Sequence, residues 1–411
     1  MHFNQATDAP DLNDQEIPTG GRLVVTEVFD AGADMPEDPV TAYRLALARA
    51  AGAMMGQGAM PPHLSRMILW LPDIGVLQDR LIDYDLAFRE TLAGNFPAIT
   101  VVEDAGLTGP KVALSAVVPP AGDPDAKVYG DFTQAEINFQ YSPRAQAPDH
   151  DKYFQLWRVS GPEYQKNRVA EVWFGETPGQ SFDLFLPDGV ENPPLHLFVH
   201  GGYWQALDKR NHAHMADALL KAGIAVAMVN YDLMPDVDLS EILRQCRAAV
   251  VRAYDVAADY GYDRDRLTVS GHSAGGHLSG ALACTDWTEF RDDLPADLLK
   301  GAVPISGLFD LEPLSKTGMQ PVFRFTADDI AGLSPVNMKP VTKIPVVLSV
   351  GSLESPEFHR QSALFADHMR AHGCPVSEAV MEGYHHFSIV EALTDPSAPL
   401  TAAIIDLVRS T

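Results

Sequence analysis

The pentapeptide GHSAG at positions 271–275 is the segment whose residue types and spacing point most directly to chemistry. It follows the apolar run Leu267–Ser270 and precedes the helix-forming run Gly276–Thr285, which is the strand–turn–helix setting of a G-x-S-x-G nucleophile elbow. The glycines permit a tight turn that exposes the serine hydroxyl, and the helix N-terminus behind it favours developing negative charge. Ser273 is therefore the candidate nucleophile.

A second motif, HGGYW at positions 200–204, directly follows the predicted strand Leu195–Val199. A glycine pair at such a place can aim backbone N–H groups at an oxyanion, where charge develops during acyl transfer. The candidate donors lie in this motif and directly after the nucleophile: Gly201, Gly202, Tyr203 and Ala274. Tyr203 and Trp204 are also candidates for a substrate-binding pocket, and plain packing is the equally weighted alternative.

A serine nucleophile needs a base and an acid that orients the base. In this kind of site the acid and then the histidine follow the serine along the chain. Glu354 comes just after an apolar strand and is the preferred acid, with Glu357 and Asp310 as rivals. His385 and His386 are adjacent candidates for the base, and the residues alone do not choose between them.

The elements that would position these residues repeat as strand–helix units from about residue 168 onward. Their strands are short, continuous apolar runs instead of alternating ones. This pattern predicts a mostly parallel sheet covered by helices on both faces.

The region before that has a different texture. Residues 22–118 predict the order β-α-β-α-β-β, an α+β arrangement, after a flexible lead-in over residues 1–20. The predicted strands include Leu64–Leu71 and Ala98–Glu103, and a single helix is predicted over 77–92. The turn-forming segment 119–125 then begins a linker to about residue 135, and the stretch 129–151 is expected to be irregular. We therefore predict a first domain over 20–120 and a second over 135–411.

Composition excludes several kinds of partner. The 411 residues carry 30 Lys+Arg against 55 Asp+Glu, a formal net charge of −25, which argues against nucleic acid and anionic membrane surfaces. No apolar stretch is long enough for a membrane span, and no signal peptide is recognisable. Three widely separated cysteines favour a reducing compartment, so a cytoplasmic location is expected. No metal or other cofactor is expected, because the remaining histidines lack a ligand spacing such as HExxH: His196, His212, His214, His272 and His277.

The motifs HGGYW, GHSAGGHL, SGLFDL, ESPEFHRQS and HHF together resemble the kynurenine formamidase branch of the α/β hydrolases, over roughly residues 135–405. The resemblance implies an α/β-hydrolase fold and a triad of Ser273, Glu354 and His386. His386 takes the base position because the family's base immediately precedes a phenylalanine, which leaves His385 a structural or substrate-facing role. The family's acid is usually an aspartate, so Glu354 is a departure.

The first half resembles the Rid (YjgF/UK114) family in its element order, its LPDI segment, its FPA tripeptide at 96–98 and its last strand. Active members place a carboxylate-binding arginine just after FPA, where this chain has Ile99. Acidic positions of the last strand are Ala113 and Ser115 here. The resemblance therefore implies an oligomerisation or docking role without the usual deaminase activity, and a homo-oligomer.

Taken together, the sequence predicts a serine hydrolase that cleaves an N-formyl or similar acyl-amide bond of a small molecule through a Ser-Glu-His triad and an acyl-enzyme. A carboxylesterase acting on small esters is the alternative enzyme, because both reactions use the same intermediate. A non-catalytic binding or scaffold protein is the alternative of another class.

Overall fold

The computed structural model describes residues 3–32, 35–92, 96–118 and 123–411. The chain folds as two compact units, a first unit that ends at Ala126 and a second unit, Lys127–Thr411.

Five described strands of the first unit form one sheet in the order β1-β4-β3-β5-β2. Their bounds are Asn4–Ala6 (β1), Arg22–Val25 (β2), Leu64–Leu71 (β3), Ala98–Glu103 (β4) and Lys111–Val118 (β5). β4 is parallel to β1 and β3, whereas β5 is antiparallel to β2 and β3. From β2 onward the unit follows the predicted β-α-β-α-β-β order, except that two helices replace the second one.

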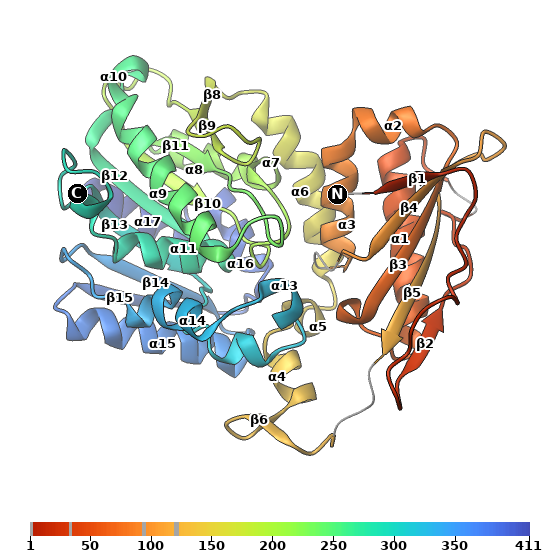
Figure 1. The fold of residues 1–411 in the computed structure, drawn as a ribbon. Helices are drawn as coiled ribbons and strands as arrows, with labels where there is room; N and C mark the ends of the chain where they lie inside the picture. The colour runs from red at the N-terminus through yellow and green to blue at the C-terminus, as the bar shows by residue number, and fades with distance from the viewer. Residues whose placement is uncertain (1–2, 33–34, 93–95, 119–122) are drawn as a thin grey trace. The chain divides into compact units, whose positions relative to one another are not determined.

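The helices α1 (Pro39–Gly56) and α3 (Leu81–Leu92) contribute to the core on one face of this sheet (Figure 1). In α1 the buried residues Tyr43, Leu47, Ala50 and Met54 recur at helical spacing. The single helix predicted over 77–92 is instead two helices, α2 (Ile74–Asp79) and α3, which are separated by Arg80. The short α2 begins early because Asp73 caps it, accepting from the Gly75 amide at 2.8 Å.

The N-terminal segment is ordered against the sheet, so the prediction of a flexible lead-in over residues 1–20 is wrong for its described part. β1 pairs in parallel with β4, and Leu12 is buried against the second face of the sheet. Gln15 Nε2 donates to Ser115 Oγ at 2.7 Å. The polar composition of this segment gave no sign of a strand. β1 forms nonetheless, because it supplies hydrogen-bond partners to the backbone groups at the edge of β4.

In the second unit, eight described strands form a sheet in the order β15-β14-β13-β12-β10-β11-β9-β8. All pairs are parallel except those that β9 makes with β11 and β8. The bounds are Ala170–Trp173 (β8), Ser181–Phe185 (β9), Pro194–Val199 (β10), Ala225–Val229 (β11), Asp263–His272 (β12), Leu299–Ile305 (β13), Val346–Gly351 (β14) and Val376–Met381 (β15).

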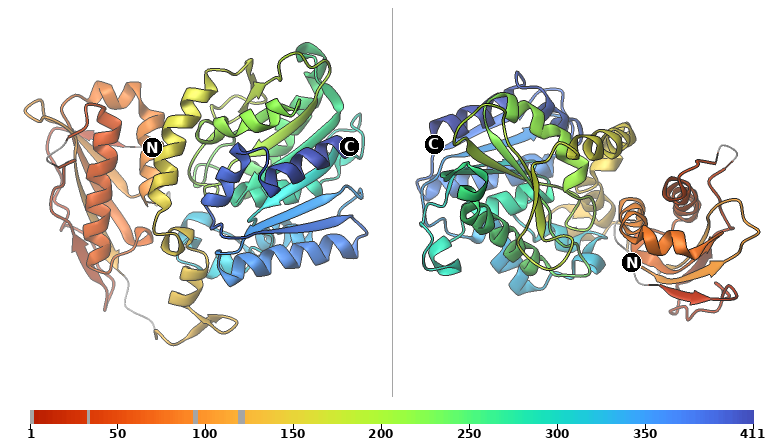
Figure 2. Two further views of the ribbon diagram at one scale, coloured as in Figure 1. Left: turned by 180° about the vertical axis from the view of Figure 1, so that it is seen from behind. Right: turned by 90° about the horizontal axis from the view of Figure 1, so that it is seen from above.

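Helices cover both faces of this sheet, as its continuous apolar strands predict (Figure 2). One core contains residues of α9 (Leu239–Asp255), α11 (Ala274–Ala283) and α15 (Pro356–Ala371). The other contains residues of α6 (His150–Gln165), α8 (Ala216–Lys221) and α17 (Pro399–Ser410). Successive residues of β10 alternate between the cores: Leu197 belongs to the first and Phe198 to the second.

The stretch 129–151 is regular, contrary to the prediction. It contains a small hairpin and two helices, followed by the start of α6: β6 (Lys127–Tyr129), β7 (Phe132–Thr133), α4 (Gln134–Gln140) and α5 (Pro143–Gln146). Thr133 and Glu136 form a capping box at the start of α4, a signal that the turn-rich composition masked. Tyr141, just after α4, is buried in the core.

The remaining short elements connect these layers. The helices are α7 (Lys209–His212), α10 (Ala257–Tyr260), α12 (Trp287–Phe290), α13 (Gln320–Phe323), α14 (Ala327–Leu333) and α16 (Ser388–Glu391), and the 3₁₀ turns are Pro61–His63, Ala213–Met215, Pro313–Lys316, Pro335–Asn337 and Ala392–Thr394. No helix in the described part of the chain is long and apolar enough to cross a membrane.

Candidate active site

Ser273 occupies a sharp turn between the end of β12 and the start of α11. Its backbone has φ 58° and ψ −115°, a conformation that non-glycine residues rarely adopt and that a nucleophile elbow requires. Its amide donates to Ile305 O at 2.8 Å, which fixes the turn to β13. A Cβ on Gly275 would lie 2.0 Å from Val199 O, so only glycine fits where the turn passes β10.

Glu354 and His386 form a close, buried pair. Glu354 lies in the turn after β14 and His386 in the loop after β15, and His386 Nδ1 lies 2.6 Å from Glu354 Oε2. The other carboxylate oxygen, Oε1, accepts from Ser306 Oγ at 2.5 Å and from the Gly351 amide at 2.8 Å. This arrangement fixes the imidazole through Nδ1 and leaves its Nε2 available for proton transfer.

The residue that precedes Ser273 contacts His386, so the two proposed catalytic residues lie in neighbouring segments. The ring of His272, the residue before Ser273, lies 4.5 Å from the His386 ring, centroid to centroid. In the described residues no hydrogen bond joins Ser273 Oγ to His386. Such a bond often tightens only when substrate binds, so this geometry is compatible with a base and its nucleophile.

The rival acids have other partners. Glu357 accepts from Tyr141 Oη at 2.7 Å and pairs with Arg360 at 2.9 Å. Asp310 also pairs with Arg360, at 3.2 Å. Glu357 and Asp310 therefore both pair with the guanidinium of Arg360. Glu354, which follows β14, contacts the imidazole of His386 instead.

His385 is turned away from Glu354. Its Nε2 lies 3.1 Å from Asp149 Oδ1, and its Nδ1 accepts from the amides of Phe387 and Ser388 at 3.2 and 3.3 Å. Burial lowers the pKa of His385, and the Asp149 carboxylate acts in the opposite direction. These contacts distinguish two adjacent histidines that the sequence left equivalent.

The 200–204 loop has the unusual backbone expected of an oxyanion-binding segment. Gly202, Tyr203 and Trp204 have φ values of 108°, 50° and 58°. A Cβ on Gly202 would lie 2.1 Å from Ala206 O, which explains the glycine. Within the described chain, the amides of Gly202, Tyr203 and Ala274 make no hydrogen bond to another protein group. They are therefore available to a ligand.

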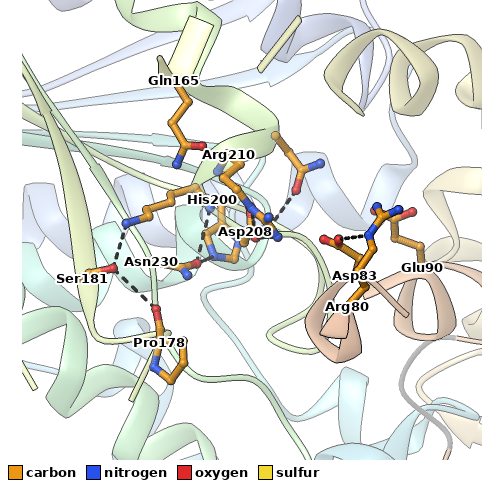
Figure 3. A network of polar contacts seen from close by, with 12 residues as sticks. Arg80, Asp83, Glu90, Gln165, Pro178, Ser181, His200, Asp208, Arg210 and Asn230 are labelled. Atoms are coloured by element: carbon orange, nitrogen blue, oxygen red, sulfur yellow. Dashed lines mark hydrogen bonds and ion pairs between the residues drawn. The ribbon is translucent and has the colours of Figure 1, made fainter. Parts of the chain in front are cut away.

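The first residue of this loop, His200, belongs to a network of polar contacts that includes Asn230 and Ser181 (Figure 3). His200 Nδ1 bonds Gly201 O at 2.8 Å, and its Nε2 bonds Asn230 Oδ1 at 3.0 Å. The backbone amide of Lys209 donates to Asn230 Oδ1 at 3.3 Å, and its buried Nζ donates to Ser181 Oγ at 2.7 Å. Sequence reasoning missed these supporting residues, because nothing in their spacing indicates that they meet.

Tyr203 and Trp204, predicted as substrate-binding residues, differ in exposure. Trp204 is fully buried and packs its ring against His277, Phe323 and Phe325, as a core residue does. Tyr203 is partly exposed and donates its hydroxyl to Tyr141 O at 2.7 Å. Burial, with the Glu354 carboxylate as a second cause, raises the pKa of Tyr203, which thus remains a neutral donor beside the site.

No group of three or more His, Cys, Asp or Glu side chains in the described ranges is arranged to hold a metal ion. The three cysteines are free and buried. The groups that the site brings together are a serine, an imidazole and backbone amides.

Comparison with known proteins identifies the class. Residues 182–318 match the family model BD-FAE. A solved structure described as a putative thioesterase from Silicibacter sp. TM1040 is 34% identical, with a TM-score of 0.59, over 66% of this chain and 98% of that one. An esterase from Pyrobaculum calidifontis, 16% identical with a TM-score of 0.53, shares the fold over 67% of this chain and 97% of its own. The second unit is thus an α/β hydrolase, and the protein is an enzyme that acts on amide or ester bonds.

The curated relatives narrow the family. The kynurenine formamidase of Danio rerio is 31% identical over 291 residues, which cover 67% of this chain and 97% of that protein. The kynurenine formamidase of Drosophila melanogaster is 27% identical over 62% of this chain and 87% of that protein. The chain belongs to the kynurenine formamidase family.

Proposed function

We propose that this protein is a serine hydrolase that cleaves an N-formyl or similar acyl-amide bond of a small molecule. The observation that carries the proposal is the buried Glu354–His386 pair beside the strained elbow of Ser273. The chain belongs to a family whose members include proteins named kynurenine formamidase, which supports an amide as the scissile bond.

The reaction follows from the roles of these three side chains. Ser273 Oγ attacks the carbonyl carbon while His386 Nε2 takes its proton, and Glu354 stabilises the imidazolium through Nδ1. His386 then protonates the departing amine as the C–N bond breaks, which leaves the acyl group on Ser273. Water, deprotonated by the same nitrogen, attacks the acyl-enzyme and releases the acid.

The amides of Gly202, Tyr203 and Ala274 are the proposed oxyanion donors, with Gly201 shaping the turn. Preorganised donors of this kind are worth about 3 kcal/mol each when they face the charge that forms in the transition state. The His200 contacts to Gly201 and Asn230 support the role, because they fix the loop before substrate arrives.

A carboxylesterase remains the second candidate. It is favoured by the similarity to a solved putative thioesterase at 34% identity, since thioesters and esters pass through the same acyl-enzyme. The satisfied hydrogen bonds of Glu354 weigh against a non-catalytic scaffold, because a buried carboxylate–imidazole pair is costly to keep without a use.

A substrate panel tests the proposal. Aryl formamides, short esters and small amides are assayed with the wild-type enzyme and with Ser273→Ala. We expect the highest kcat/KM on an aryl formamide and loss of turnover on every substrate in the variant. Undiminished rates in Ser273→Ala would contradict the mechanism, and a clear preference for esters would replace the amidase by the esterase.

For the first unit we propose a Rid-like module that acts in self-association and lacks the usual deaminase chemistry. Ile99 is buried in the core of that unit and offers no hydrogen bond to a carboxylate. Ala113 and Ser115 are buried too, and Ser115 Oγ accepts from Gln15. Absence of imine hydrolysis by the wild-type enzyme is the expected result.

A further inference from the structure

Ser306, the residue that follows β13, combines a contact to the proposed acid with an unusual backbone conformation. Its hydroxyl donates to Glu354 Oε1 at 2.5 Å, and only 1% of its surface is exposed. Its φ of 48° lies in the left-handed region, which residues other than glycine rarely adopt. Strained residues of this kind cluster at functional sites, and the reaction steps above give Ser306 no role.

The backbone of the same segment contacts the nucleophile. The carbonyl of Ile305, the last residue of β13, accepts from the Ser273 amide at 2.8 Å. The Ser306 amide donates to the carbonyl of Ser349 in β14 at 2.7 Å, which continues the pairing of the two strands past the end of β13. This segment therefore touches the nucleophile through its backbone and the acid through the side chain of Ser306.

The end of β13 and the start of α11 are packed too closely to shift independently. A Cβ on Gly276 would lie 2.6 Å from Ile305 O and 2.8 Å from the Cα of Gly307. Gly307 directly follows Ser306, so the turn that carries the hydroxyl lies against the helix that follows the nucleophile. The Ser306 hydroxyl is thus a donor with a fixed position relative to Ser273.

A glutamate in the acid position has a particular need for such a donor. Its carboxylate has one more rotatable bond to the backbone than that of an aspartate, so it can face away from the base in more ways. Its Oε2 lies 2.6 Å from His386 Nδ1, and its Oε1 accepts from Ser306 and from the Gly351 amide. The side chain is 1% exposed, so these protein donors take the place of water.

We infer that Ser306 is a positioning residue whose hydroxyl holds the Glu354 carboxylate in the orientation that stabilises the His386 imidazolium. This inference rests on the proposed function of the site. It also accounts for the strained backbone of Ser306, which turns the chain after β13 so that the hydroxyl faces the acid. Ser306 acts through the acid and the base, so its loss slows the chemical step more than it weakens substrate binding.

Two substitutions remove the hydroxyl and affect the backbone differently. Ser306→Ala keeps the strained conformation, whereas Ser306→Gly relieves it, because glycine adopts a positive φ readily. We expect both variants to lower kcat by at least about tenfold with KM within about twofold, since a misplacement of a catalytic group by about 1 Å can cost about 10². We expect the Tm of Ser306→Gly to equal or exceed that of Ser306→Ala, so the loss of turnover does not follow stability.

A conservative variant and a second backbone keep the comparison decisive. Ser306→Cys retains a weak donor of similar size, and we expect its kcat to lie between those of Ser306→Ala and wild type. If Ser306→Ala does not fold, Ser306→Gly takes its place in every comparison. Wild-type kcat in Ser306→Gly would overturn the positioning role.

A double-mutant cycle with Glu354 tests whether Ser306 acts through the acid. Ser306→Ala is combined with Glu354→Ala, and kcat is compared among the wild type, the two single variants and the double variant. In the Glu354→Ala background the hydroxyl has no carboxylate to hold, so we expect its loss there to change kcat by less than about twofold. An equal fall in kcat in both backgrounds would overturn the inference.

Ser349→Ala is the matched control. Ser349 is a buried serine of the neighbouring strand β14, and its hydroxyl donates to the carbonyl of Ala379 in β15 at 3.0 Å. We expect this variant to lower Tm about as much as Ser306→Ala, with kcat within about twofold of wild type. A fall in kcat as large as that of Ser306→Ala would mean that the loss of any buried hydroxyl nearby suffices, which would overturn the inference.

The rate at which an alkyl fluorophosphonate labels Ser273 separates this inference from the proposed function. The reagent forms a bond from Ser273 Oγ to phosphorus with loss of fluoride, so it reports an activated serine without any particular substrate. Labelling of the wild type at a rate that is unchanged in Ser306→Gly would overturn the inference and leave the serine hydrolase intact. No labelling of Ser273 in the wild type would overturn the proposed function and the inference with it.

Discussion

At the scale of residues, the contact between Glu354 and His386 is the geometric basis of the proposed triad. Glu354 and Glu357 are three positions apart and His385 and His386 are adjacent, so distance along the chain cannot rank them. In the structure they differ in their partners: Glu357 pairs with Arg360, and His385 contacts Asp149. The family resemblance had selected Glu354 and His386, and substitution is the test of that selection.

The two histidines provide the first prediction. We expect His386→Ala to lower kcat/KM by a factor on the order of 10³, because it removes both the proton acceptor and the proton donor. His385→Ala is expected to stay within about tenfold of wild type, because its loss removes a partly exposed contact with Asp149 that lies away from Glu354. Comparable rates in His386→Ala and wild type would refute the choice of base.

Buried neutral histidines make stability depend on pH, which is the second prediction. Burial lowers the pKa of His196 to about 3 and that of His277 to about 4. In the unfolded chain both titrate near 6.5. Below about pH 6.5 the unfolded chain therefore binds protons that the folded protein refuses, and the free energy of unfolding falls as pH falls.

The slope is measurable by denaturant unfolding between pH 4.5 and 6.5. Each such histidine contributes up to about 1.4 kcal/mol per pH unit. His196→Gln is expected to flatten the slope by about this amount, and an unchanged slope would count against a neutral His196 in the fold.

At the scale of elements, the approach of the elbow to β10 supplies the third prediction. Gly275→Ala would place a methyl group 2.0 Å from Val199 O and 2.7 Å from His200 O, both of them backbone atoms that cannot move aside alone. We expect loss of activity together with a destabilisation of several kcal/mol, since overpacking a rigid turn typically costs about 1–3 kcal/mol or more. Thermal unfolding and turnover are the measurements.

Gly332→Ala in α14 is its control, because a Cβ there meets no atom within 4 Å. This exposed helical position should gain up to about 1 kcal/mol from alanine, with activity unchanged. If both alanine variants behaved alike, the close approach of the elbow to β10 would not be the reason for Gly275.

The elements also show what the sequence could and could not predict. Strands such as β3 and β4 were predicted at their observed bounds, because apolar β-forming runs with sharp ends leave little choice. The helix α4 was missed, because its capping box lies among turn-forming residues and its buried face is short. The Lys209–Ser181 and His200–Asn230 contacts join residues of separate strands and loops, which no local pattern encodes.

At the scale of the whole molecule, the Rid-like interpretation of the first unit leads to the fourth prediction. We expect the full chain to sediment as a homo-oligomer at micromolar concentration. This expectation rests on the resemblance of the unit to the Rid family; the apolar residues on the second face of its sheet, Ile68, Val102 and Ala113, are buried beside Leu12. A monomer throughout the concentration range would contradict an association role for this unit.

The division into two compact units also bears on how the enzyme is studied. Every residue of the proposed triad and oxyanion loop belongs to Lys127–Thr411. A change in the first unit leaves these residues unaltered, and a sedimentation experiment on such a variant tests whether a loss of activity accompanies a change in assembly.

The pairing of β1 with β4 sets an order of events during synthesis. Asn4 lies opposite Thr100, so the two partners are separated by roughly a hundred residues of chain, a contact of long sequence range. During synthesis, β1 leaves the ribosome first, and its backbone groups remain hydrogen-bonded to water until β4 has been made. Pairing of β1 with β4 is consequently a late step in the folding of the first unit. Slower translation before residue 98 would lengthen the period in which the unpaired backbone of β1 can bind other chains.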